Sequence, residues 1–141
     1  MMLLEGLVAI LIFSLGVMSI VKLQAVSIQQ STAAEYRSVA ALLANDLVSR
    51  MWASDKTAAT LQSNFASANN GSGYSSWLSS VQSSGLPNVS ATKNTLPTVT
   101  FSTVAGGGTA PTSSSKATIT VFWVAPGDSN VHSYVAVAQL K

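Results

Sequence analysis

The hydrophobic and polar positions divide the chain into a long apolar start, an amphipathic continuation and a polar remainder that ends in alternating segments. Residues 1–21 read MMLLEGLVAILIFSLGVMSIV and contain one charged side chain, Glu5. A helix rises about 1.5 Å per residue, so this stretch makes a helix of about 30 Å, long enough to cross the hydrocarbon core of a bilayer. We therefore predict a membrane-spanning helix over residues 1–21.

The pattern predicts that the helix continues over residues 22–53, which contain no proline and no glycine. Apolar side chains recur every three or four residues from Leu23 to Met51, which is typical of an amphipathic helix with one face buried. We expect Leu42, Val48 and Trp52 to widen the apolar face, and the polar face to carry Arg37, Asn45, Asp46 and Arg50.

Residues 54–96 are predicted to form a region of short helices and loops. We predict a helix over residues 57–68 that buries Leu61 and Phe65. Residues 69–73 have the composition of a turn. A second helix is expected over residues 74–84, ended by Gly85 and Pro87. Large apolar residues at helical spacing are normally buried, so we expect Trp77, Leu78 and Val81 to lie in the core.

Residues 97–141 change to the alternation of strands. Segments 97–104, 116–125 and 131–140 alternate apolar and polar side chains, and they are separated by a loop over residues 106–115 and a turn over residues 126–130. Three such strands predict an antiparallel meander, whose apolar face the amphipathic helix would cover. The expected fold class is α+β: a long N-terminal helix packed on a small antiparallel sheet.

Composition argues against several functions. The seven basic residues are scattered singly and the net charge is +2, whereas a nucleic-acid interface gathers them on one face. Without cysteine there is no thiol chemistry, and three Asp and two Glu make a metal site improbable. The single histidine, His132, lies four residues from Asp128 across a predicted turn, and no nucleophile is suggested nearby. We predict no catalytic residue, no metal and no cofactor, and therefore not an enzyme.

Glu5 is the exception within the apolar stretch. A carboxylate at the centre of a bilayer costs about 2.5 kcal/mol or more, so an acid in such a segment is interpreted as a functional group that needs a partner. The nearest cation is an amino group at the start of a chain, either its own or that of a neighbouring chain. The alternative interpretation is an ordinary signal anchor with a stray acid.

Residues 1–16, MMLLEGLVAILIFSLG, resemble the mature N-terminus of type IV pilins and of the pseudopilins of type II secretion. The resemblance implies that a prepilin peptidase cuts a leader before Met1, that Met1 is N-methylated, and that Glu5 serves filament assembly. It also implies that residues 1–21 pack against other pilin subunits with the help of the pilus assembly machinery, while residues 22–53 pack on the chain's own head. Many major pilins have glycine and proline where this chain has Ser14 and Lys22, which leaves open whether the helix loosens in a filament.

Two further segments resemble PilV-type minor pilins: the helical Trp77-Leu78 and Val81 followed by Gly85-Leu86-Pro87, and the strand 119–123. This resemblance implies a minor pilin that primes, assembles or modifies the filament, placed first in the bacterial inner membrane and then in the extracellular pilus, with roles in cell adhesion and twitching motility. The alternatives are a major pilin, a type II secretion pseudopilin, or an adhesin displayed at the tip. For the adhesin, the loop over residues 105–115 is the expected contact.

Overall fold

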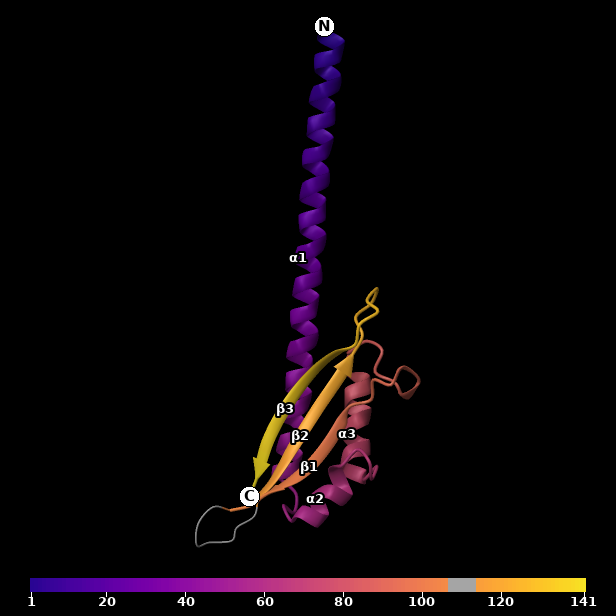
Figure 1. Ribbon diagram of the computed structural model, residues 1–141. Helices are drawn as coiled ribbons and strands as arrows, with labels where there is room; N and C mark the ends of the chain where they lie inside the picture. Colours follow the sequence, from indigo (N-terminus) through magenta and orange to yellow (C-terminus); the bar gives the residue numbers. More distant parts are fainter. Residues whose placement is uncertain (107–113) are drawn as a thin grey trace. The chain divides into compact units, whose positions relative to one another are not determined.

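The computed structural model describes residues 1–106 and 114–141 and has an α+β fold (Figure 1). The predicted class, a long N-terminal helix with a small antiparallel sheet, is confirmed. The elements in chain order are α1 (Met2–Trp52), α2 (Ala58–Phe65), α3 (Ser72–Ser83), a short 3-10 helix (Ala91–Lys93), β1 (Thr98–Val104), β2 (Ser114–Trp123) and β3 (His132–Leu140).

The chain separates into two compact units, residues 1–35 and residues 36–141. The first unit consists of the beginning of α1. The second unit contains the rest of α1, together with α2, α3 and the sheet, and we call it the head. The predicted divisions at residues 21, 53 and 96 followed changes in composition and stay predictions.

The sheet of the head has the strand order β1-β2-β3, with both neighbouring pairs antiparallel. Val99 of β1 pairs with Ile119 of β2, which pairs with Ala136 of β3. Beyond β1, the main-chain N–H of Ser67 donates to the carbonyl oxygen of Val99 at 3.1 Å, and the N–H of Val99 donates to the Ser67 hydroxyl at 3.2 Å. The segment between α2 and α3 therefore protects the edge of β1 at this position.

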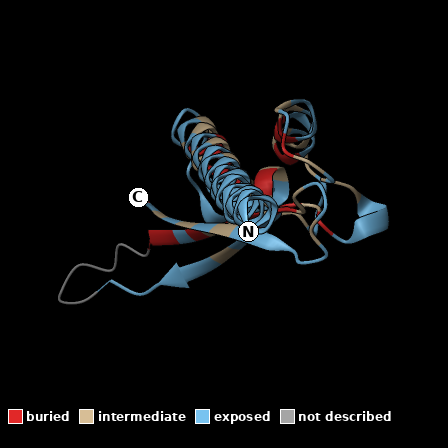
Figure 2. Cartoon of the chain, turned by 90° about the horizontal axis from the view of Figure 1, so that it is seen from above, coloured by how far each residue is buried: buried red, intermediate tan, exposed pale blue. Residues whose placement is uncertain are grey.

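The core of the head lies among the last turns of α1, the two short helices and one face of the sheet. Figure 2 shows the buried residues gathered in this region, and the buried face of β2 carries the predicted alternation of apolar side chains. The α1 contribution repeats at three- and four-residue intervals, as predicted for its amphipathic half. The buried apolar residues of α1 and β2 are Ala40, Leu43, Ala44, Leu47, Met51, Ala117, Ile119, Val121 and Trp123.

The predicted widening of the α1 face was wrong at two positions. Leu42 is 69% exposed and Trp52 is 48% exposed, whereas Val48 packs partly against the core. Successive helical residues are about 100° apart, so Leu42 and Trp52 lie beside the buried Leu43 and Met51 but outside their row. The ammonium of Lys56 lies over the Trp52 ring, 4.7 Å from its centroid, and covers part of this exposed surface.

The short helices follow the prediction with small differences in their ends. Leu61, Phe65, Trp77 and Val81 are buried, and Leu78 is half-buried. The helix α3 begins at Ser72, inside the stretch predicted as a turn. Gly71, directly before it, passes close to α2, since a Cβ there would meet the carbonyl oxygens of Ser63 and Asn64. Gly85, with φ +89°, follows the end of α3 as expected for a helix stop.

The strands β1 and β2 agree with the predicted alternation, but β3 exposes Val135 and Val137 on its outer face, and β2 starts earlier than expected. Ser114 and Ser115 were predicted to lie in a loop, and they are buried residues of β2 that pair with Val104 and Thr103 of β1. Their hydroxyls carry no apolar signal, so alternation alone did not include them. Residues 107–113, most of the predicted loop, lie outside the described residues.

Candidate functional site

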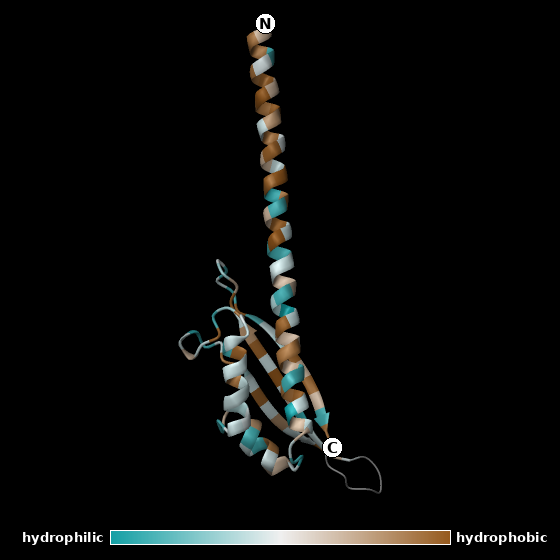
Figure 3. Ribbon diagram, turned by 180° about the vertical axis from the view of Figure 1, so that it is seen from behind, coloured by the Kyte–Doolittle hydropathy of each residue, from teal (hydrophilic) through white to brown (hydrophobic). Residues whose placement is uncertain are grey.

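The first 35 residues of the chain form a helix whose side chains are left almost entirely uncovered by the part of the chain that the structure describes. All of these residues are exposed except Thr32, which is half-buried. Figure 3 shows the concentration of hydrophobic residues near the N-terminus of α1. Among the residues that the structure describes, α1 is the one helix long and apolar enough to cross a membrane. We call residues 1–21 the apolar segment.

The polar side chains of the apolar segment are compatible with an apolar environment. The hydroxyl of Ser14 donates to the carbonyl oxygen of Leu11, and that of Ser19 donates to the carbonyl oxygen of Leu15, both at 2.9 Å. A hydroxyl bonded within its own helix does not need water as a partner, which removes most of the penalty of burying it. Among the polar side chains of this segment, the Glu5 carboxylate is therefore the one whose burial costs the most free energy.

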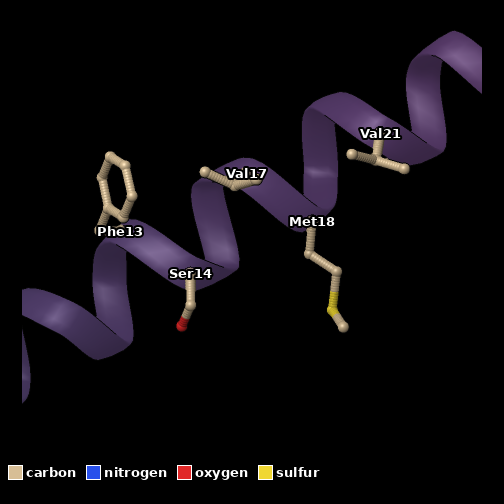
Figure 4. Close-up of a pocket in the computed structure, with 5 residues that line it drawn as sticks. All are labelled: Phe13, Ser14, Val17, Met18 and Val21. Carbon is tan, nitrogen blue, oxygen red and sulfur yellow. The ribbon is translucent and has the colours of Figure 1, made fainter.

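A shallow hollow lies on the surface of the apolar segment (Figure 4). Two neighbouring rows of side chains line it, and the residues of each row are spaced four apart along the helix. Helices pack by placing such rows of side chains into the grooves of a partner helix, so the hollow has a shape against which another helix can pack. One row contains Phe13, Val17 and Val21, and the other contains Ser14 and Met18.

Glu5 lies in the first turn of α1, and its side chain is exposed. Its main-chain N–H donates to the carbonyl oxygen of Met1 at 3.2 Å, and a carboxylate near a helix N-terminus is favoured by the helix dipole. In the described part of the chain, Arg50 and Asp46 form an ion pair at 3.0 Å, and the imidazole of His132 lies 2.7 Å from the carboxylate of Asp128. No cation of the described chain, the amine of Met1 included, lies within 4.0 Å of the Glu5 carboxylate.

The structure brings His132 and Asp128 together, which sequence reasoning did not anticipate. The antiparallel register ends with Trp123 opposite His132, so the turn between these residues folds Asp128 back to the imidazole. The Pro-Gly-Asp-Ser-Asn sequence of the turn was the available signal. No third acid or histidine joins this pair, because residues 1–106 and 114–141 hold no group of three such side chains.

No protein-family model, curated protein or solved structure matches the chain. The apolar segment and its single carboxylate are the features that most need a partner outside the chain.

Proposed function

We propose that the chain is a structural subunit of a type IV pilus, in the role of a PilV-like minor pilin that primes, assembles or modifies the filament. The apolar segment holds the chain in the bacterial inner membrane before assembly, and then packs against other pilin subunits in the extracellular filament. One observation carries the proposal: the exposed apolar segment contains one acid, Glu5, and no cation of the described chain pairs with it.

The exposed apolar surface indicates that the apolar segment is buried in an environment other than water. Burying the side chain of a large aliphatic or aromatic residue is worth about 1.5–3 kcal/mol, and the apolar segment exposes many of them. Both a lipid bilayer and a bundle of similar helices supply this burial. The two environments differ in how they treat Glu5.

Glu5 favours the helical bundle as the final environment. In hydrocarbon its carboxylate has no partner, whereas a neighbouring subunit can bring its Met1 amine to the carboxylate as the two helices align. An ammonium–carboxylate pair in an apolar surrounding is a strong hydrogen bond and fixes the register of the two helices. We expect Met1 to be N-methylated, and the methylated amine keeps the positive charge that this pair needs.

Variants of Glu5 test the proposal. Glu5→Gln and Glu5→Val are expected to insert into the membrane at normal levels and to reach sheared filaments in strongly reduced amounts, because the cation of the neighbour is left unpaired. Glu35→Gln is the matched control: this acid is also exposed on α1, but it lies beyond the apolar segment, so it should enter filaments normally. Normal entry of the Glu5 variants would refute the role of the carboxylate.

A pseudopilin of type II secretion and a major pilin would use the apolar segment in the same way. Deletion of the gene distinguishes a pseudopilin from a pilin: loss of secretion with normal pili would favour a pseudopilin. The adhesin alternative placed its contact on residues 105–115, most of which lie outside the described residues. An attachment assay on piliated cells that carry a deletion of this loop tests that alternative directly.

A further inference from the structure

The turn between α2 and α3 contains the only asparagine of the chain that is followed by a glycine, Asn70-Gly71. The side chain of Asn70 is exposed, and its main chain is left-handed with φ +48°. The main-chain nitrogen of the next residue can attack an asparagine side-chain amide and close a succinimide ring. Glycine hinders this attack least because it has no Cβ, whereas a branched residue crowds it.

The fold leaves both reacting groups of this pair unoccupied. Within residues 1–106 and 114–141, the side-chain amide of Asn70 forms no hydrogen bond, and the main-chain N–H of Gly71 donates to no acceptor. The neighbouring Asn69 differs, because its amide donates to the carbonyl oxygen of Gln62 at 2.9 Å. At Asn70, therefore, neither reacting group has to give up a hydrogen bond before the nitrogen of Gly71 reaches Cγ.

A hydroxyl of α3 polarises the peptide unit that carries the attacking nitrogen. Oγ of Ser75 donates to the main-chain carbonyl oxygen of Asn70 at 3.3 Å. This oxygen and the nitrogen of Gly71 belong to the same peptide unit, and a hydrogen bond to the oxygen draws electron density from the nitrogen. The N–H of Gly71 is then more readily deprotonated, and the deprotonated nitrogen is the nucleophile.

Two other exposed asparagines lack this combination. Asn88 also has a left-handed main chain, with φ +59°, but its amide donates to the carbonyl oxygen of Val124 at 2.8 Å. The residue after it is the branched Val89. Asn130 is also followed by a valine, and its amide donates to the carboxylate of Asp128 at 3.2 Å. Exposure and a left-handed main chain are therefore shared features, whereas the glycine and the unbonded amide distinguish the turn before α3.

We propose that Asn70 is a site of spontaneous covalent modification, where the folded chain converts asparagine into aspartate and isoaspartate. The nitrogen of Gly71 forms a bond to Cγ of Asn70, the bond from Cγ to Nδ2 breaks, and the amide leaves as ammonia with the proton of the Gly71 N–H. Water then opens the succinimide at one of its two carbonyls and gives either product. The reaction needs no other reactant, and it does not depend on the proposed role in a filament.

Both products change the head next to the contact between α2 and α3. Each adds a negative charge to a chain whose net charge is +2, so the modified chain has a more acidic isoelectric point. The new carboxylate lies just before the first turn of α3, where the helix dipole favours it. Isoaspartate also adds a carbon to the main chain directly before Gly71, which passes close to the carbonyl oxygens of Ser63 and Asn64.

Incubation of the folded full chain in detergent micelles at mildly alkaline pH, followed by peptide mapping with mass spectrometry, tests the proposal. The mass gain of an amide replaced by an acid should appear at Asn70, in a larger fraction of chains than at Asn88 at every time point. An acidic band on isoelectric focusing should grow in parallel. The proposal would be overturned by equal gains at the two asparagines. It would also be overturned if Asn70 stayed unchanged while a synthetic peptide of residues 66–76 was modified in the same buffer.

Three variants assign the acidic band to one residue. Asn70→Gln should abolish the band, because a glutamine amide would have to close a larger and slower-forming ring. Asn70→Asp should migrate with the band before any incubation, since it carries the charge of the product. Asn88→Gln is the matched control, because it removes an exposed asparagine with the same left-handed main chain, and it should leave the band unchanged. A band that persists in Asn70→Gln would refute the assignment.

Discussion

The indole Nε1–H of Trp77 in α3 donates a hydrogen bond of 2.9 Å to the main-chain carbonyl oxygen of Leu43 in α1. Both residues are buried, and they are 34 positions apart in the chain. A buried indole needs such a partner, because an unpaired N–H is costly away from water. This bond gives the contact between the two helices a fixed register that apolar packing alone would leave looser.

Replacing Trp77 separates the hydrogen bond from the packing. Trp77→Phe keeps most of the apolar contact and should destabilise the head by about 1–2 kcal/mol, whereas Trp77→Ala should cost about 3–5 kcal/mol. Denaturation of the full chain in detergent, followed by near-ultraviolet circular dichroism, measures the difference. Equal losses in the two variants would contradict the packing role of the ring.

Gly71 is expected to tolerate no larger residue. A Cβ at this position would meet main-chain carbonyl oxygens of α2, which cannot move as a side chain can. Gly71→Ala should therefore lower the unfolding free energy of the head by about 1–3 kcal/mol. Gly16→Ala is the control, because nothing lies within 4 Å of a Cβ there, and the same denaturation experiment should show an unchanged head.

Arg50 joins α1 to α3 through weak and exposed contacts. Its Nε lies 3.0 Å from the Asp46 carboxylate, and its other nitrogens reach the hydroxyls of Ser76 and Ser80 at 3.4 Å. Because the pair is exposed to solvent, Arg50→Gln should cost less than about 1 kcal/mol at low salt and less again at high salt. Thermal denaturation at two salt concentrations measures this; a large loss that salt does not reduce would show that Arg50 has a different role.

Tyr74 should make the head sensitive to alkali. Its hydroxyl donates to the carbonyl oxygen of Pro97 at 2.6 Å, and burial raises its pKa above the ordinary value of 10.0. The unfolded chain therefore releases this proton at a lower pH than the folded chain, so the stability is complete below the ordinary pKa and is lost as the pH rises through the raised one.

Tyr74→Phe tests this alkaline dependence. The variant should lose about 1 kcal/mol at pH 7, with the hydrogen bond, but should show a smaller fall in stability above pH 10. The control Tyr36→Phe retains the Tyr74 phenol and should retain the steep fall. Parallel alkaline curves for Tyr74→Phe and the unmodified chain would contradict the burial of this phenol.

Apolar periodicity was enough to predict most of the fold, because the buried faces of α1, α3 and the strands consist of regularly spaced apolar side chains. Apolar periodicity failed to predict burial where the burial depends on how another element packs against the residue. Ser114 and Ser115 are buried because β2 extends past its apolar residues, and Leu42 is exposed although it is as apolar as Leu43. The Asp128–His132 contact depends on the turn and on the strand register, which spacing alone does not give. Glu5 was apparent from the sequence because a single acid interrupts an otherwise uncharged segment.

The copy number of the chain in filaments sheared from cells tests the central claim most directly. The proposal predicts that the chain is present in purified filaments, in trace amounts relative to the main subunit, and that deletion of its gene reduces piliation. A ratio near parity would keep the filament role but replace the minor role with that of a major subunit. A chain that stays entirely in the membrane fraction, while filaments assemble normally without it, would contradict the claim that its apolar segment packs in a pilus.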